Sequence, residues 1–219
     1  MTANERWRAV AIAGHTDDVA TATTALVDPD PVIRELALGA LDRLGALPDI
    51  VVTASLADPD HRVRRRGATL AGRRPDVSLI AALDDPDIDV VETAAWACGE
   101  QERDGGPDDR IVSRLIELAR EAAEPLVREA AVAALGAIGD ERGLPAILAG
   151  CADKPAVRRR AVLALAPFDG PEVDAALRAA LTDRDWQVRQ SAEDVVRASA
   201  DPDLDLDVDT GTETETDPD

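Results

Sequence analysis

Apolar residues recur along this chain with a helical period, and the whole pattern repeats about every 30 residues. The third residue of each copy is a branched aliphatic residue, and arginine follows it in five of the six copies. A tiny residue comes three positions after the arginine and an apolar residue comes seven after it. These offsets place the apolar positions on one stripe of a helix. The copies start at residues 31, 61, 88, 125, 155 and 186. Such a repeat predicts stacked helical units rather than one globular core.

Four positions define the repeat. The aliphatic position holds Ile33, Val63, Val90, Val127, Val157 and Val188. The arginine position holds Arg34, Arg64, Arg128, Arg158 and Arg189, and Val91 replaces arginine in the third copy. The tiny position, which lets a neighbouring helix approach closely, holds Ala37, Gly67, Ala94, Ala131, Ala161 and Ala192. The last apolar position holds Leu41, Ala71, Cys98, Leu135, Leu165 and Val196.

Turn and cap residues predict a second, preceding helix in each unit. Asp-Pro-Asp at 28–30, 58–60 and 85–87 breaks the chain between the two helices. The residue before each copy is a favourable N-cap at Asp30, Asp60, Asp87 and Asp185, and a weaker one at Glu124 and Lys154. The preceding helices are predicted over 17–27, 49–57, 76–84, 108–121, 143–151 and 171–182. Residues 5–13 are predicted to be the second helix of a truncated leading unit that caps the stack.

The Asp-Pro-Asp turns, the Val-Arg pairs and the alanine-rich second helices resemble the HEAT repeat, in the short form known from phycobilisome lyases (PBS lyase HEAT-like repeats). The resemblance covers about residues 5–200. It implies an all-α, armadillo-like α-solenoid of about six helix-turn-helix repeats in residues 1–200. It also implies that the second helices line the concave side. The repeated arginines would form a ladder with the turn acids Asp28, Asp58, Asp85 and Asp183 or with backbone carbonyls.

Charge and composition refine this interpretation. The net charge is −20, and residues 201–219 hold nine acids and no base, so we expect a disordered acidic tail there. This tail is also a candidate to associate with the chain's own concave groove. No apolar run is long enough for a membrane span, and the first residues lack the apolar core of a signal peptide, so we expect a cytoplasmic protein.

The outward positions of the second helices supply the candidate binding residues. They place Trp96 between two arginine groups, a composition common in binding hot spots. Two alternatives stay open for Trp96: exposure on the groove, or rotation inward to fill space beside Cys98 and Ala94. Trp7 is expected to cover the first unit. The candidate concave-face residues are Arg65, Arg66, Arg73, Trp96, Arg159, Arg160 and Leu163.

No catalytic constellation emerges from the residues. We expect His15 and His61 to be surface residues, and neither cysteine has a nearby histidine in the sequence. We therefore expect neither a metal nor another cofactor. The leading hypothesis is a non-catalytic scaffold that binds a protein or peptide on its concave face. One alternative, from the resemblance, is a lyase-like subunit of an enzyme assembly. Another is nucleic-acid processing, which the acidic charge disfavours.

Overall fold

The computed structural model describes residues 1–102 and 106–200, the side chain of Ala200 excepted. Over these residues the chain forms helices and no strand, so the predicted all-α fold is confirmed. The segment 201–219, for which we expect a disordered acidic tail, lies outside the described residues. None of the described helices is both long and apolar enough to cross a membrane.

Two sets of helices alternate along the chain. We call the first set the inner helices: α1 (Ala3–Ala13), α3 (Pro31–Arg43), α5 (His61–Ala71), α6 (Ile88–Glu100), α8 (Pro125–Ile138), α10 (Pro155–Ala164) and α12 (Trp186–Ala200). The outer helices are α2 (Val19–Ala25), α4 (Asp49–Ser55), α7 (Asp109–Glu121), α9 (Leu144–Gly150) and α11 (Pro171–Ala180). Two short 3-10 helices, η1 (Ala82–Asp84) and η2 (Glu141–Gly143), belong to the outer row.

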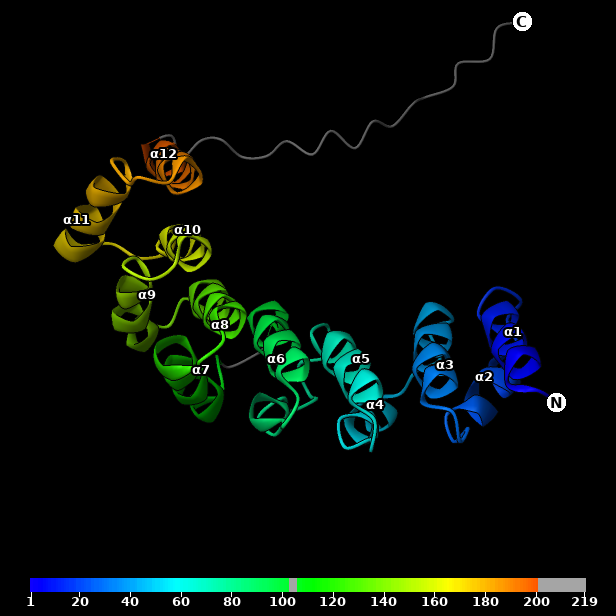
Figure 1. Ribbon diagram of the computed structural model, residues 1–219. Helices are drawn as coiled ribbons and strands as arrows, with labels where there is room; N and C mark the ends of the chain where they lie inside the picture. The colour runs from blue at the N-terminus through cyan, green and yellow to red at the C-terminus, as the bar shows by residue number, and fades with distance from the viewer. Residues whose placement is uncertain (103–105, 201–219) are drawn as a thin grey trace, which may run out of the picture.

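The helices stack into a curved, two-layered solenoid (Figure 1). Each inner helix contacts the next inner helix along the chain, from α1 through to α12, and each outer helix packs against the inner helix that follows it. The inner helices line the concave side of the curve and the outer helices the convex side (Figure 1). The expected α-solenoid architecture is therefore confirmed.

Local capping starts the inner helices where the sequence predicts. The carboxylates of Asp30, Asp60, Asp87 and Asp185 each accept the backbone N–H two residues later, at 2.9–3.1 Å. Glu124 and Lys154 make no such side-chain bond, and a proline opens the first turn of both α8 and α10 instead.

The core is the continuous seam between the two layers. The predicted aliphatic positions are all buried, as are the tiny positions between them. Val196 is the exception to the predicted stripe, because it is 40% exposed while its neighbour Val195 is buried. Val196 lies on α12, the last inner helix of the described residues, and none of the described helices follows it to cover that side.

The prediction of a helix over 76–84 is wrong for most of that segment. Only η1 is helical there, and the preceding residues form turns. Val77 and Leu79 are both buried with exposed Ser78 between them, a spacing of two that suits extended backbone rather than an α-helix. The side-chain amide of Gln101 donates to the carbonyls of Ala71, Arg74 and Val77 at 2.9–3.0 Å, which ties the end of α6 to this turn segment.

An arginine–aspartate ladder joins the repeats. The Arg34 guanidinium donates to both carboxylate oxygens of Asp58, at 2.9 and 2.6 Å, and also to the carbonyl of Asp28 in its own turn, at 2.9 Å. Each arginine thus clamps its own turn to the turn of the next repeat. The same bidentate pairing joins Arg64 to Asp85, Arg128 to Asp153, and Arg158 to Asp183.

Two residues of the ladder were not predicted from the sequence. Arg6 of α1 pairs with Asp28 at 2.7 and 3.2 Å, so the ladder begins one unit earlier than predicted. Asp153 supplies the acid in a turn that lacks the Asp-Pro-Asp motif. At the other end, Arg189 donates to the Asp183 carbonyl at 2.7 Å and has no acidic partner among the residues described.

One rung of the ladder, meaning one arginine–aspartate pair, is missing, and both of its members are replaced by apolar residues. Val91, which replaces the ladder arginine, is buried in α6. The position that should supply the acid is Ala122, because its carbonyl accepts from Arg128 as the Asp28 carbonyl accepts from Arg34. Ala122 packs against the apolar core. Apolar contact therefore replaces an ion pair between the third and fourth repeats.

Restoring this rung tests that account. Val91→Arg alone should lower the free energy of unfolding by about 3 kcal/mol or more, because it buries a cation without a partner. Adding Ala122→Asp should recover about 1–3 kcal/mol through the coupling of the two new charges. Urea unfolding of both single variants and the double variant measures this coupling. If the free energy of unfolding of the double variant is no higher than the sum of the two single effects predicts, the assignment of Ala122 is contradicted.

The ladder also predicts sensitivity to acid. The paired guanidinium holds the pKa of Asp28, Asp153 and Asp183 below the ordinary value. Burial alone would raise the pKa of Asp58 and Asp85, but their arginine partners and backbone N–H groups keep it lowered as well. A lowered folded-state pKa contributes stability that is complete above the unfolded pKa, near 4, and is lost as the pH falls through the folded value.

Asp58→Asn isolates this contribution. At pH 7 it should lower the free energy of unfolding by about 1.5–3 kcal/mol, the range for hydrogen bonds to charged groups. The difference from wild type should shrink below about pH 4, as Asp58 itself becomes protonated. Urea unfolding between pH 7 and pH 3 measures it, with exposed Asp76→Asn as the matched control. A difference that stays constant down to pH 3 would speak against the ladder as the acid-sensitive element.

Candidate binding surface

The inner helices present one continuous surface on the concave side. Trp7 of α1, Leu36 and Gly39 of α3, and Arg66 of α5 line one depression on it. These residues occupy the first, second or fifth position after a ladder arginine. These positions after the ladder arginine therefore share one face over the first three inner helices.

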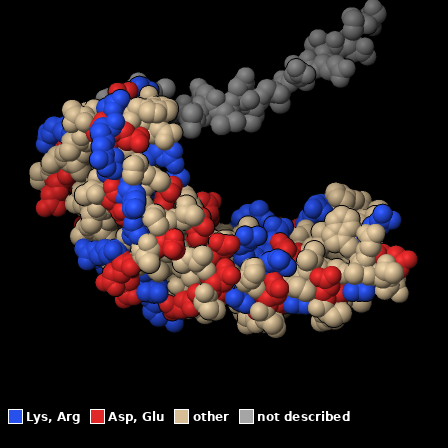
Figure 2. Space-filling view, viewed as in Figure 1, with Lys and Arg blue, Asp and Glu red and all other residues tan. Residues whose placement is uncertain are grey.

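The arginines of α5 dominate the middle of this surface. Figure 2 shows basic residues gathered over α5 on the inner side of the curve. Arg65 is exposed and lies 3.8 Å from Asp89, a loose surface pair that contributes little. Arg73 lies in the turn after α5 and is bonded to Asp42 at 2.8 Å, next to Arg74, which holds the same carboxylate. Arg66 has no acidic partner in the described part of the chain.

Trp96 is neither fully exposed nor sealed inside. Its ring packs partly against the core, and the Arg160 guanidinium lies 4.8 Å from the ring centroid. This distance is within the range of a cation–π interaction. Arg159 and Arg160 also approach the carboxylate of Glu129, at 3.7 and 3.8 Å. Both alternatives for Trp96 are thus half right: the ring fills space and still borders the surface.

Arg160 reaches Trp96 from α10 across α8, because the helices between them pack closely. A methyl group at Gly136 of α8 would overlap Ala164 of α10, and one at Gly99 of α6 would lie 2.9 Å from the Ala134 Cα. Alanines cover much of the rest of α8. Leu163 of α10 is partly buried and packs against the core.

Acidic residues divide the two arginine groups. Burial raises the pKa of Glu92 above its ordinary value, and the negative charges of Asp89 and Glu129 raise it further. This cluster lies on α6 and α8, between the arginines of α5 and those of α10.

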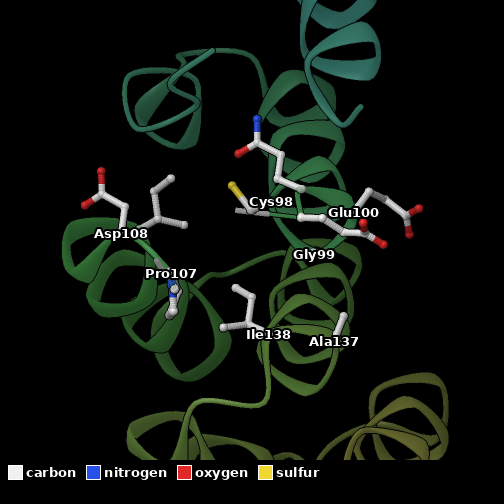
Figure 3. A pocket seen from close by; sticks show the side chains of 11 residues that line it. Cys98, Gly99, Glu100, Pro107, Asp108, Ala137 and Ile138 are labelled. Atoms are coloured by element: carbon white, nitrogen blue, oxygen red, sulfur yellow. The ribbon is translucent and has the colours of Figure 1, made fainter. Parts of the chain in front are cut away.

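A separate hollow lies where α6 and α8 end and α7 begins (Figure 3). It is lined by Cys98, Gly99, Pro107, Asp108, Ala137 and Ile138, among others. Asp108 caps α7, accepting from the backbone N–H of Arg110 at 2.9 Å and from its guanidinium. The carboxylate therefore has a structural role.

The described residues contain no cluster of His, Cys, Asp or Glu that could hold a metal ion. His15 and His61 are both exposed, and His61 lies 3.5 Å from Asp87. Burial raises the pKa of the Cys151 thiol to about 11, which disfavours the reactive thiolate.

Two surface residues were missed by the sequence interpretation. Trp7 does not simply cover the first unit, because it remains 45% exposed and borders the depression on α3. Arg43, at the end of α3, lines the same depression. The signal was present in the repeat phase: Arg6 is a ladder arginine, so Trp7 directly after it corresponds to Arg65 and Arg159.

Comparisons with known proteins address the fold. An engineered protein superimposes with a TM-score of 0.59 at 19% identity, over 82% of this chain and 95% of its own. A designed armadillo repeat protein gives 0.57 at 18% identity, over 82% and 99%. YibA of E. coli gives 0.57 at 16% identity, over 92% and 78%. At these identities the similarity concerns the fold alone.

A search of curated proteins finds no match. The family of HEAT repeats matches residues 75–156 and 112–200, which together span more than half of the chain. The short phycobilisome-lyase form of the repeat is not distinguished by this match. The ladder, the paired helices and the family match agree, and the chain belongs to the HEAT repeat family.

Proposed function

We propose that this protein is a scaffold that binds a protein or peptide partner on its concave surface. The observation that supports this most is the combination of tryptophan and arginine on the inner helices. Trp7 and Trp96 both border the surface, and arginines lie beside each of them. Rigid rings and planar cations bury much area at a low entropic cost, which is why they recur in interface hot spots.

The form of the surface favours an extended partner over a small molecule. The candidate residues lie on α1, α3, α5, α6 and α10, spread along the curve rather than around one enclosed cavity. A stacked solenoid offers such an extended concave face as a consequence of its curvature. A peptide or a protein edge could follow it from one inner helix to the next.

The charge pattern disfavours a nucleic acid. A phosphate backbone is held by a continuous track of cations. Here Asp89, Glu92 and Glu129 interrupt the surface between the arginines of α5 and α10, and the whole chain has a net charge of −20. A polypeptide with mixed charge and apolar side chains matches this alternation better.

Charge reversal on the inner helices, with the same change on the outer helices as a control, tests the proposal. Arg65→Glu with Arg160→Glu should reduce the amount of specific partner protein captured from native lysate by at least about 5-fold, since central interface arginines are common hot spots. Quantitative mass spectrometry of the captured proteins is the measurement. The matched control is Arg120→Glu with Arg178→Glu on the outer helices α7 and α11, which makes the same change in charge. Circular dichroism verifies that both variants keep their helices. Equal capture by both variants would reject a concave binding site.

A further inference from the structure

We propose that the N-terminal part of the concave surface is a site for an acidic peptide segment that carries a bulky apolar side chain. The site, called the N-terminal groove below, is formed by α1, α3 and α5. Its residues are Trp7, Val32, Glu35, Leu36, Gly39, Arg43 and Arg66. This inference rests on the proposed function and adds the chemistry of the partner and the place where it binds.

The floor of the N-terminal groove is apolar and accessible. Trp7 is 45% exposed and Val32 is 40% exposed, although both are large apolar side chains. Leu36 lines the same groove and is only partly buried. Grouped apolar residues of this kind that remain in contact with solvent mark places where a partner can bury surface. A tryptophan ring is especially suited to receive an aliphatic or aromatic side chain.

Glycines make room for the two arginines of the groove. A Cβ atom at Gly39 would lie 2.9 Å from Nη2 and 3.6 Å from Cζ of Arg66, so this guanidinium rests over the bare backbone of α3. Arg43 packs against Gly14 in the same way, because a Cβ there would lie 2.6 Å from its Nη1. Both cations are therefore held in place before a partner arrives, which lowers the entropic cost of binding.

Neither arginine has an acidic partner among the described residues. The ladder arginines are bidentate to aspartates, and Arg65 and Arg73 each approach an acid. Glu35 lines the same groove but forms no ion pair with Arg43 or Arg66. The chain has 44 acids and 24 bases, so most of its arginines have an acid within reach. Two arginines without one, beside an exposed tryptophan, leave their hydrogen-bond donors available to carboxylates of a partner. Arginine binds carboxylates through paired hydrogen bonds, so we assign carboxylates of the partner to these positions.

The chain's own segment 201–219 shares the required chemistry, because Leu204, Leu206 and Val208 alternate with acids there. However, α1 and α12 lie at opposite ends of the curved stack (Figure 1). We therefore commit to a separate partner and treat the chain's own segment as a competitor that the experiment must detect.

A synthetic probe tests the site on the full chain. The probe is a fluorescein-labelled peptide of sequence Glu-Glu-Phe-Glu-Glu-Leu-Glu. Its binding to the full chain is measured by fluorescence anisotropy at 50 mM and 200 mM NaCl. We expect saturable binding that weakens at the higher salt, as screening of charge pairs requires. A peptide with alanine in place of Phe and Leu should bind about 10-fold more weakly, because two apolar side chains no longer reach the floor.

Matched variants locate the binding. Arg43→Gln with Arg66→Gln should weaken probe binding by about 10-fold or more, and Trp7→Ala by about 5-fold or more. Arg120→Gln with Arg178→Gln on the convex side makes the same change in charge and should stay within about 2-fold of wild type, since distant charges are largely screened. Equal losses in the two double variants, or no saturable binding of the probe, would overturn the assignment. Circular dichroism of each variant separates loss of binding from loss of fold.

Two further outcomes discriminate between sites and occupants. If Arg65→Glu with Arg160→Glu abolishes binding of the probe but Arg43→Gln with Arg66→Gln does not, the concave function stands and the N-terminal groove is the wrong place. Replacing the nine acids of 201–219 by their amides in the full chain tests the competitor. Unchanged affinity supports a separate partner. A gain of about 5-fold or more would show that the chain's own segment occupies the site and would overturn our commitment.

Discussion

The rest of this structure depends on the arginine–aspartate rung between successive turns. Arg34 holds the Asp28 carbonyl of its own turn and the Asp58 carboxylate of the next, so one side chain fixes two backbones relative to each other. Apolar packing between helices is adaptable and would tolerate sliding of one repeat on another. A planar guanidinium with fixed bidentate geometry does not tolerate it. The rung therefore sets the register that the apolar seam alone leaves loose.

The missing rung shows that two neighbouring repeats can be joined without an arginine–aspartate pair. Val91 and Ala122 replace both members of one pair, which avoids burying a single unpaired charge. Close packing replaces the lost ion pair there. Gly99 lets α6 approach Ala134 of α8, and the Gln101 amide ties the end of α6 to the turn after α5. Helix contact can thus hold the register where the small residues permit it.

The repeat phase predicts most of the fold, because burial, capping and turn chemistry all act locally at fixed offsets. It fails where tertiary context overrides it, as at Val77 and Leu79, whose spacing suits extended backbone, and at Val196, which has no described neighbour to cover it. The inner surface was less predictable. The position of Arg160 over Trp96 depends on how closely α8 packs between them, and this is a property of three helices together rather than of any one segment.

The ladder and the concave surface are geometrically coupled. Successive residues of an α-helix are about 100° apart, so an arginine fixed at the edge of the stack turns the next two residues toward the concave side. Trp7 follows Arg6, Arg65 and Arg66 follow Arg64, and Arg159 and Arg160 follow Arg158. A bond that sets the register of the repeats therefore also aims the residues that would contact a partner. Loss of a rung should consequently disturb binding even where no contact residue changes.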